Sequence, residues 1–302
     1  MLDTNLSQFP LTELQFPVIY RELANSSEGI FELSEKSIEE AFEFLNSASV
    51  HAVILSGFLA DNGIDEDLNR GKFFGHRDER GEIDGIALIG HSTIFDVRTQ
   101  TALTAFAAEA KRSTRPINLV MSSGELAETF FNEYSGFLYS PRKRCVEYSF
   151  FTGFPFVVQE SGYKIRLATA DDLEQVARVQ AELAFIESGV NPLAIDPDGF
   201  RRRVLRRISQ GRTYVVTDNG SLMFKADLMA STSEIAYLEG VYVSPEERGK
   251  GTGPACLSQV CIELLRFSSS ICLLSNIELK QAHKCFERAG FRRGDNLVSL
   301  FL

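Results

Sequence analysis

The chain has 302 residues, of which 44% are hydrophobic, and a formal net charge of −10 at pH 7. This length suits two domains, and no apolar run approaches the ~20 residues that a membrane-spanning helix needs. The acidic excess lies wholly in residues 1–150, with 13 Lys and Arg against 23 Asp and Glu, whereas residues 151–302 carry 18 of each. A surface of that sign repels polyanions, so the composition argues against nucleic-acid binding.

Targeting signals and cysteine usage point to a reducing compartment. Residues 1–7 contain no basic segment followed by an apolar one, so we expect no signal peptide. The five cysteines are an odd number, form no CxxC pair and mostly lie in apolar runs, which indicates buried free thiols. We therefore expect a cytoplasmic protein that does not bind membranes.

The first half is expected to alternate helices and strands. Helical periodicity covers residues 37–46, 100–111 and 125–134. Strand-like apolar runs cover residues 52–55, 81–91 and 117–121.

A junction between two domains is expected within residues 150–162. This segment contains Gly153, Pro155 and Gly162, which are typical of a linker. We accordingly divide the chain into domains of residues 1–155 and 156–302.

The second half opens with a strand-like run, residues 163–168, and a helix. Thr169 can cap that helix over residues 170–186, with Asp172 at its third position. Further on, Asp218-Asn219-Gly220 separates two strand-like runs, which is a strong signal for a β-hairpin.

A further helix is expected from about residue 198 to Gly211, and it is rich in arginine. Apolar residues interleave with the arginines at helical spacing, which indicates a helix with a solvated basic face. An anion-binding role for this face stays open. The arginines are Arg201, Arg202, Arg203, Arg206 and Arg207.

The most informative stretch is Arg248-Gly249-Lys250-Gly251-Thr252-Gly253. It lies between a strand-like run, residues 237–243, and an apolar-periodic helical run that begins at Pro254. Three glycines in five positions let backbone N–H groups point toward one centre, and the next helix adds its positive N-terminal end. A phosphate group fits such a nest, although the flanking residues match neither a P-loop nor a dinucleotide-binding turn.

Three elements complete the second half. Residues 270–275 predict a short buried strand, and the next helix is expected to end at Ala289 with Gly290 as its left-handed cap. Residues 297–302 are expected to form a last strand that closes the sheet.

The glycine loop resembles the pyrophosphate loop of the GCN5-related N-acetyltransferases (GNAT), with Arg248, Gly251 and Gly253 in the places of the family's pattern. Residues 240–251 are similar to the family's fourth strand with its loop, and residues 282–291 to its last helix. The resemblance covers roughly residues 164–302. It implies an α/β fold with a mixed sheet that binds acetyl-CoA (coenzyme A).

The element order of the first half is similar to that of the second. Residues 95–101 occupy the place of the glycine loop but contain no glycine. We therefore expect tandem GNAT folds in which the N-terminal copy is degenerate and lacks a pyrophosphate loop. This arrangement resembles a bacterial group of two-domain acetyltransferases.

The resemblance implies that backbone groups of the fourth strand pair with the pantetheine amides. The Val243 N–H would donate to the thioester oxygen and so act in catalysis, while the valine side chains pack as strand core. The residues expected to bind the cofactor are Val241, Tyr242, Val243, Arg248, Gly249, Lys250, Gly251, Thr252, Gly253, Asn276 and Phe286.

Glu239 is the expected general base. It has the same parity as Val241 and Val243 in an apolar strand, where partial desolvation would raise its pKa toward the working range. The alternatives are a solvated glutamate at this position and Glu187, near the end of the first helix, as the base. Tyr237 and Tyr242 are expected to pack rather than to act as bases.

The last helix departs from the family pattern. Phe286 stands where the family usually has a Tyr that protonates the departing thiolate, and Leu279 stands where an Asn is common. A thiolate with a pKa of about 8.5 is a tolerable leaving group without that acid. His283 could replace the acid only if its ring reaches the sulfur, and we expect it to lie at the surface.

The sequence therefore predicts an N-acetyltransferase that acts on a small-molecule amine or an exposed amino group by direct attack in a ternary complex. The negative charge favours a cationic amine. The alternative is an acyl-CoA-binding sensor or structural protein that is catalytically weak or inactive. We expect no metal, and self-association into a homodimer stays open.

Overall fold

The computed structural model describes residues 29–46, 49–153 and 162–302. The expectation for residues 1–7 and most of the predicted junction, residues 154–161, lie outside this part of the chain. None of the helices in the described residues is long and apolar enough to cross a membrane.

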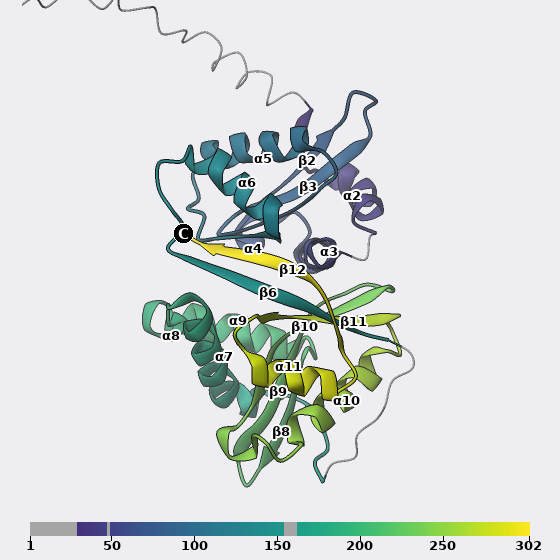
Figure 1. Ribbon diagram of the computed structural model, residues 1–302, viewed down its shortest axis with the longest axis vertical. Helices are drawn as coiled ribbons and strands as arrows, with labels where there is room; N and C mark the ends of the chain where they lie inside the picture. The colour runs from purple at the N-terminus through teal and green to yellow at the C-terminus, as the bar shows by residue number, and fades with distance from the viewer. Residues whose placement is uncertain (1–28, 47–48, 154–161) are drawn as a thin grey trace, which may run out of the picture.

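The first half of the chain alternates helices and strands as predicted except at residues 52–55, which are helical (Figure 1). Its strands are β1 Ile30–Glu32, β2 Gly71–Arg77, β3 Ile83–Gly90, β4 Ser92–Val97, β5 Leu119–Ser123 and β6 Lys143–Thr152. Its helices are η1 Glu35–Ser37, α2 Ile38–Leu45, α3 Val50–Asn62, α4 Glu66–Asn69, α5 Gln100–Arg112 and α6 Gly124–Ser135.

The second half repeats this order of elements. Its strands are β7 Arg166–Leu167, β8 Thr213–Asp218, β9 Ser221–Ser231, β10 Ile235–Val243, β11 Ser270–Asn276 and β12 Arg292–Phe301. Its helices are η2 Ala170–Asp172, α7 Leu173–Ser188, α8 Pro192–Ile195, α9 Pro197–Ser209, η3 Pro245–Glu247, α10 Thr252–Leu264 and α11 Lys280–Arg288.

Local signals in the second half are confirmed where they were strongest. Thr169 and Asp172 form the predicted capping box at the start of η2, ahead of α7. Asn219 and Gly220 both have positive φ, at 48° and 77°, as the predicted two-residue hairpin turn requires. Gly290 follows α11 with a φ of 100°.

All the strands of the described residues join in one sheet of 12 strands, in the order β1-β2-β3-β4-β5-β12-β6-β11-β10-β9-β8-β7. The last strand of each half is exchanged, because β12 pairs with β5 of the first half while β6 pairs with β11 of the second. The two exchanged strands also pair with each other, antiparallel, from Arg292↔Phe151 to Phe301↔Lys143. Figure 1 shows β6 and β12 side by side where the halves meet.

This exchange corrects the expectation for residues 297–302. They do form a strand, but β12 lies in the interior of the sheet and links the two halves instead of closing one of them. The strands thus cross the division that we drew at residue 155. Register across the chain could not be foreseen from local pattern, because pairing partners here are about 140–180 residues apart.

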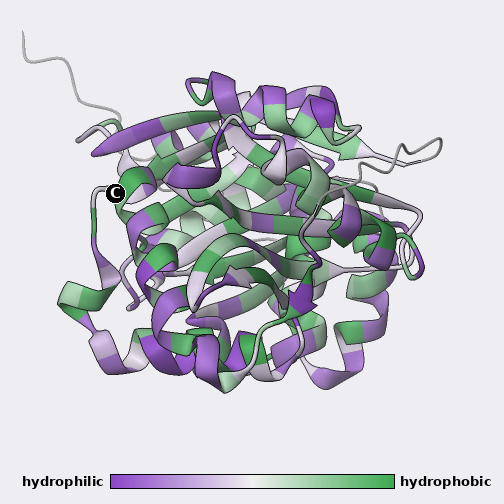
Figure 2. Ribbon diagram, turned by 90° about the horizontal axis from the view of Figure 1, so that it is seen from below, coloured by the Kyte–Doolittle hydropathy of each residue, from purple (hydrophilic) through white to green (hydrophobic). Residues whose placement is uncertain are grey.

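Helices cover both faces of the sheet. Helices α5 and α6 pack on one face with Val298 and Leu300 of β12, and α10 and α11 continue the same layer over Phe150 of β6. Helices α2 and α3 lie on the opposite face. Figure 2 shows the hydrophobic residues gathered inside and hydrophilic residues along the outward sides of the peripheral helices.

Helix α3 corrects a second expectation, since residues 52–55 were predicted to form a strand. Nine of its 13 residues are buried, and they lie on all sides of the helix. Its apolar residues therefore show no helical periodicity. A short apolar run of this kind cannot be assigned to strand or helix from periodicity alone. The helix is buried because it spans both halves, contacting β4 of the first and β9 and β10 of the second.

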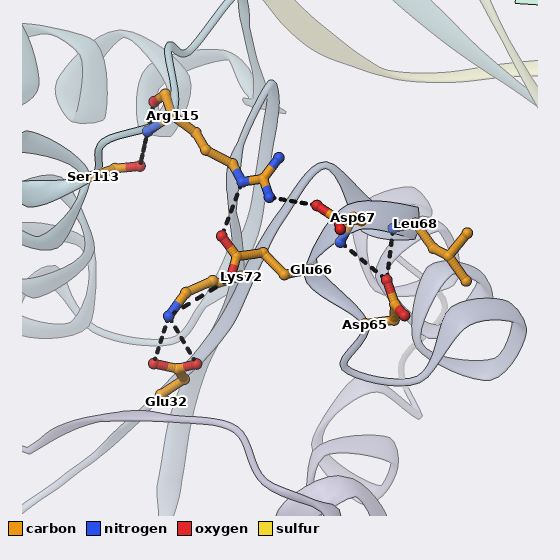
Figure 3. Close-up of polar contacts among 8 residues, drawn as sticks. All are labelled: Glu32, Asp65, Glu66, Asp67, Leu68, Lys72, Ser113 and Arg115. Carbon is orange, nitrogen blue, oxygen red and sulfur yellow. Dashed lines mark hydrogen bonds and ion pairs between the residues drawn. The ribbon is translucent and has the colours of Figure 1, made fainter. Parts of the chain in front are cut away.

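A surface network joins the connection after α5 to the outer strands of the first half (Figure 3). Arg115 pairs with Glu66 at 2.9 Å and with Asp67 at 2.8 Å, and Lys72 pairs with Glu32 at 3.2 Å. These side chains are exposed, so each pair contributes at most about 1 kcal/mol. All of these residues belong to the first half, so the network does not join the halves, whereas the packing of α3 does.

Gly57 is expected to be essential to that packing. A Cβ at this position would lie 2.3 Å from Ala230 Cβ on β9, so the helix or the strand would have to move. Although Ala is intrinsically better than Gly in a helix by about 1 kcal/mol, we expect Gly57→Ala to destabilise the protein by about 1–3 kcal/mol. Urea unfolding followed by circular dichroism measures this.

The control is Gly124→Ala in α6, where the added Cβ makes an ordinary 3.7 Å contact with Val298. This variant should be as stable as the unmodified protein or slightly more so. A stabilised Gly57→Ala would contradict the close approach of α3 and β9.

Candidate functional site

Strands β10 and β11 separate halfway along their length. They pair in parallel only from Ile235↔Ser270 to Leu238↔Leu273. In the described part of the chain, residues 239–243 have no partner on β11. The other edge of β11 pairs with β6 from Ile271 to Asn276. Within the described residues, the backbone of Val241 and Val243 thus has no strand partner on that side.

A β-bulge turns the side chains of β10 at this point. The register against β9 shifts between Glu239 and Tyr242, and Gly240 there has a φ of 60°. Leu238, Val241 and Val243 consequently pack in one cluster beneath α10, although they are not all of the same parity. Glu239 therefore does not share a face with Val241 and Val243, which corrects that part of the prediction.

A buried polar network holds the bulge in place. Lys225 Nζ donates to Gly240 O at 3.2 Å, to Gln180 Oε1 at 2.6 Å and to Asp227 Oδ2 at 2.6 Å. Lys225 is wholly buried, and a Cβ on Gly240 would lie only 2.7 Å from its Nζ. Glycine at position 240 is needed both for this close approach and for the positive φ.

Asp227 balances the charge of this network. It accepts hydrogen bonds from Lys225, from Arg207 Nη1 at 2.9 Å and from Thr213 Oγ1 at 2.8 Å. Burial alone would raise the pKa of Asp227, but the charges of Lys225 and Arg207 hold it below its ordinary value. Asp227 is therefore ionised at neutral pH, and the buried Lys225 has a fixed counter-charge.

The glycine loop forms an open nest at the start of α10. Gly251 is the N-cap, with a φ of 91°, and the cap makes no side-chain hydrogen bond to the helix. The backbone N–H groups of the first turn are thus left for an anion. Gly253 lets α10 pack closely, because a Cβ there would lie 2.8 Å from Cys285 Sγ and 3.0 Å from Val243 Cγ2.

Side chains beside the nest are tied to the protein. Arg248 Nε donates to Val243 O at 3.1 Å, which joins the loop to the end of β10. Lys250 pairs with Glu247 at 3.0 Å, and Thr252 Oγ1 donates to the same carboxylate at 2.7 Å. The negative charge of Glu247 is therefore compensated beside the anion site.

Three carboxylates, those of Glu239, Glu187 and Glu147, influence one another at the bulge. Burial raises the pKa of Glu239, the Arg207 charge opposes the rise and the Asp227 charge adds to it. Burial and the charges of Glu239 and Glu147 raise the pKa of Glu187 to about 8. Glu187 nevertheless remains exposed to water, which screens these charges and tempers the shift.

Phe286 and His283 of the last helix, α11, both turn inward. Phe286 is buried, with its ring 5.5 Å from that of Phe150, so it is part of the core beneath the site. His283 was expected at the surface, but it is half-buried against Tyr148 and Phe150 and its Nε2 donates to Asn276 O at 2.9 Å. Asn276 ends β11, and its side chain accepts from Glu278 N.

The arginines of α9 divide between the surface and the interior. Arg201 pairs with Glu174 at 2.9 Å and Arg203 with Asp196 at 3.3 Å, both on the exposed side. Arg206 reaches Asn62 of α3, and Arg207 enters the buried network. The predicted solvated basic face is thus only half correct.

The corresponding place in the first half is closed. Strand β4 also leaves β5, after Ile94↔Met121, but Ser122 Oγ donates to Phe95 O across the gap and Phe95 stacks on Phe130 at 4.8 Å. Thr99 caps α5 by accepting from Ala102 N. The start of α5 is thus capped by a side chain and the gap between β4 and β5 is bridged by a hydrogen bond, unlike the corresponding places in the second half.

Two parts of the site were missed from the sequence. The Lys225–Asp227 pair and Arg207 lay in segments interpreted as ordinary strand and solvated helix. Alternate charged residues in an otherwise apolar strand were the available signal. Glu147 gave no such signal in the sequence, because it lies beside the second half only through the exchange of β6.

Asp227 is expected to be critical for stability. We predict that Asp227→Asn lowers the free energy of unfolding by about 3–5 kcal/mol, because it leaves Lys225 buried without its counter-charge. The matched control, Asp198→Asn at the exposed start of α9, should cost less than about 1 kcal/mol. Chemical unfolding of the three proteins decides the question, and equal stabilities would contradict the role given to Asp227.

No family model matches the sequence, and no curated protein matches it. Solved structures do match the fold. A Drosophila protein is 14% identical over 90% of this chain and 98% of its own, with a TM-score of 0.63. A tandem GNAT protein from the clavulanic acid biosynthesis pathway is 12% identical over 90% of this chain and 98% of its own, with a TM-score of 0.55. A GNAT-family acetyltransferase from Colwellia psychrerythraea is 12% identical over 90% of this chain and 99% of its own, with a TM-score of 0.53. The chain therefore has the α/β fold of the GCN5-related N-acetyltransferases in a tandem arrangement, as its sequence predicted.

Proposed function

We propose that this protein transfers an acetyl group from acetyl-CoA to a primary amine by direct attack in a ternary complex. The observation that carries the proposal is the combination of separated strands and an uncapped helix in one half only. Strand β10 leaves β11 at Glu239, and the uncapped N-terminus of α10 follows β10 directly. In the described residues of the first half β4 also leaves β5, but Ser122 Oγ donates to Phe95 O across the gap and Thr99 caps α5.

The residues present fit coenzyme A. The backbone N–H groups of Gly249, Gly251, Thr252 and Gly253 would hold the pyrophosphate, while the Lys250 N–H donates to Glu247 O at 3.4 Å. The exposed side chain of Arg248 adds positive charge. The free backbone of Val241 and Val243 would pair with the pantetheine arm, and the Val243 N–H would donate to the thioester oxygen. The bound thioester supplies an activated acetyl group.

Glu239 is the proposed general base. It stands where the two strands part, and its raised pKa suits a carboxylate that accepts a proton near neutral pH. The amine nitrogen forms the new bond to the acetyl carbon, the carbon–sulfur bond breaks with its electron pair going to sulfur, and a nitrogen proton passes to Glu239, directly or through a water. Glu187, whose pKa is also raised, is the alternative base.

A second function, binding of acyl-CoA without turnover, is favoured by Phe286. This side chain packs in the core and has no proton to donate to the departing thiolate. Calorimetric binding of acetyl-CoA, together with release of free thiol in the presence of primary amines, separates the two functions. Amine-dependent thiol release supports the transferase, whereas binding without release from any amine supports the second function.

The nest itself can be tested with Gly251→Trp. We expect at least about tenfold weaker binding of acetyl-CoA, because the side chain would fill the space in front of the N–H groups at a helix N-terminus. The control is Gly220→Trp in the β8–β9 hairpin, where φ is also positive and nothing lies within 4 Å of an added Cβ. Calorimetry should find binding unchanged in the control, and unchanged binding in Gly251→Trp would refute the nest.

The base can be tested through the pH profile. A carboxylate must be ionised to accept a proton, so the rate should rise as pH increases through the raised pKa of Glu239 and then level off. Glu239→Gln should lower kcat by about 10²–10⁴-fold and remove that rise. The same profile measured for Glu187→Gln is the comparison, and loss of the rise in that variant alone would move the role of base to Glu187.

A further inference from the structure

The exchanged strand β6 carries a carboxylate of the first half into the site of the second. Glu147 lies opposite Asn276 of β11 on one side and Leu297 of β12 on the other. Tyr148 and Phe150 of β6 contact the ring of His283 on α11. Because successive side chains of a strand alternate between faces, Glu147 points to the opposite face.

That face is the one on which Glu239 lies. Phe151 of β6 and Tyr237 of β10 pack in the cluster around α3, and they have the same parity as Glu147 and Glu239 respectively. Lys225 and Asp227 alternate with Phe224 and Ala226, which pack beneath α10, so they share the opposite face with Glu239. Glu147 and Glu239 therefore stand on one face, on the two strands that flank β11.

Glu147 is only partly satisfied by the protein. Ser299 Oγ of β12 donates to its Oε2 at 2.6 Å. Within the described residues, no hydrogen bond or ion pair reaches the other oxygen, Oε1, and none reaches the carboxylates of Glu239 and Glu187. Burial raises the pKa of Glu147, the bond from Ser299 opposes this, and the charge of Glu239 adds to it.

Three incompletely paired carboxylates at one place repel one another. Glu239 and Glu147 each disfavour ionisation of Glu187, and Glu239 disfavours that of Glu147. A cation placed among them would remove this repulsion and supply the missing hydrogen-bond donors. The charges of Lys225 and Lys143 offset part of this repulsion at Glu187, but Lys143 Nζ donates to the backbone oxygens of Ile186 and Glu187 at the end of α7 and to none of the three carboxylates in the described residues.

We infer that Glu147, supplied by the first half through the strand exchange, is an acceptor-binding residue that selects a cationic amine for the site of the second half. The inference rests on the proposed function, because it names the acceptor class of the same site. The ammonium group donates one hydrogen bond to Glu147 Oε1, and Glu239 stands beside it to take a proton. Ser299 fixes the orientation of the Glu147 carboxylate.

The test measures binding of small amines to the full chain saturated with coenzyme A, by saturation-transfer NMR at pH 7. Butylamine and benzylamine are the cationic probes, and aniline, which is neutral at this pH, is the uncharged one. Since a hydrogen bond to a charged group contributes about 1.5–3 kcal/mol, Glu147→Gln should weaken binding of both cations at least about tenfold. Binding of aniline should change by less than about twofold, because no charge is lost between it and the site.

Three further variants make the comparison specific. Glu147→Asp keeps the charge and should retain most of the cation affinity. Ser299→Ala keeps the carboxylate but loses its orienting bond, so it should weaken cation binding less than Glu147→Gln does. Glu263→Gln, on the far layer in α10 and paired at the surface with Arg266, should have no effect.

The outcomes separate the inference from the proposed function. Equal weakening of cations and aniline in Glu147→Gln, unchanged cation binding in that variant, or no binding of either cation to the unmodified chain would overturn the role of Glu147. Cation binding that depends on Glu147 but releases no thiol from acetyl-CoA would uphold it and reject the transfer reaction instead.

Discussion

The antiparallel pairing of β6 with β12 is the interaction on which the rest of the structure depends. Each of these strands has left its own half and joined the other, so their ladder is the seam of the 12-stranded sheet. Without it, β12 beside β5 and β6 beside β11 would each present an unpaired edge in the middle of the molecule. Helices also bridge the two halves, because α3 of the first half packs on β9 and β10 of the second and α6 packs on β12.

The seam determines what the site can contain. Strand β10 can part from β11 because β11 is held on its other side by β6, so the opening does not leave β11 without a neighbour. The bulge at Gly240 keeps the strands apart, and the buried Lys225–Asp227 pair fixes the bulge. The first half is therefore not a passive appendage, since its strand β6 holds the other edge of β11 and carries Glu147, the residue that we propose binds the acceptor.

Sequence reasoning succeeded where a short segment determines its own conformation. The hairpin at Asn219-Gly220, the cap at Thr169 and the loop before α10 each follow from the backbone preferences of a few residues, and the tandem fold followed from their order. It failed where burial or distant pairing decides. Helix α3 has no helical periodicity because both halves cover it, and β12 pairs with strands about 140–180 residues away. One extra residue at the bulge places Glu239 on the face opposite Val241. The strand, loop and helix of the candidate site could thus be predicted, but the environment that the strand exchange and the bulge create around them could not.

The exchange of strands also imposes an order on biosynthesis. Strand β6 is synthesised before β11, with which it pairs in the second half. Strand β5 lacks its neighbour β12 until residues 292–301 have left the ribosome. The chain therefore carries an open apolar edge through the synthesis of its whole second half, when such edges are most exposed to aggregation. Contacts this distant in sequence also make folding slow. Helper proteins that shield nascent chains would act on this protein chiefly between the completion of β5 and the arrival of β12.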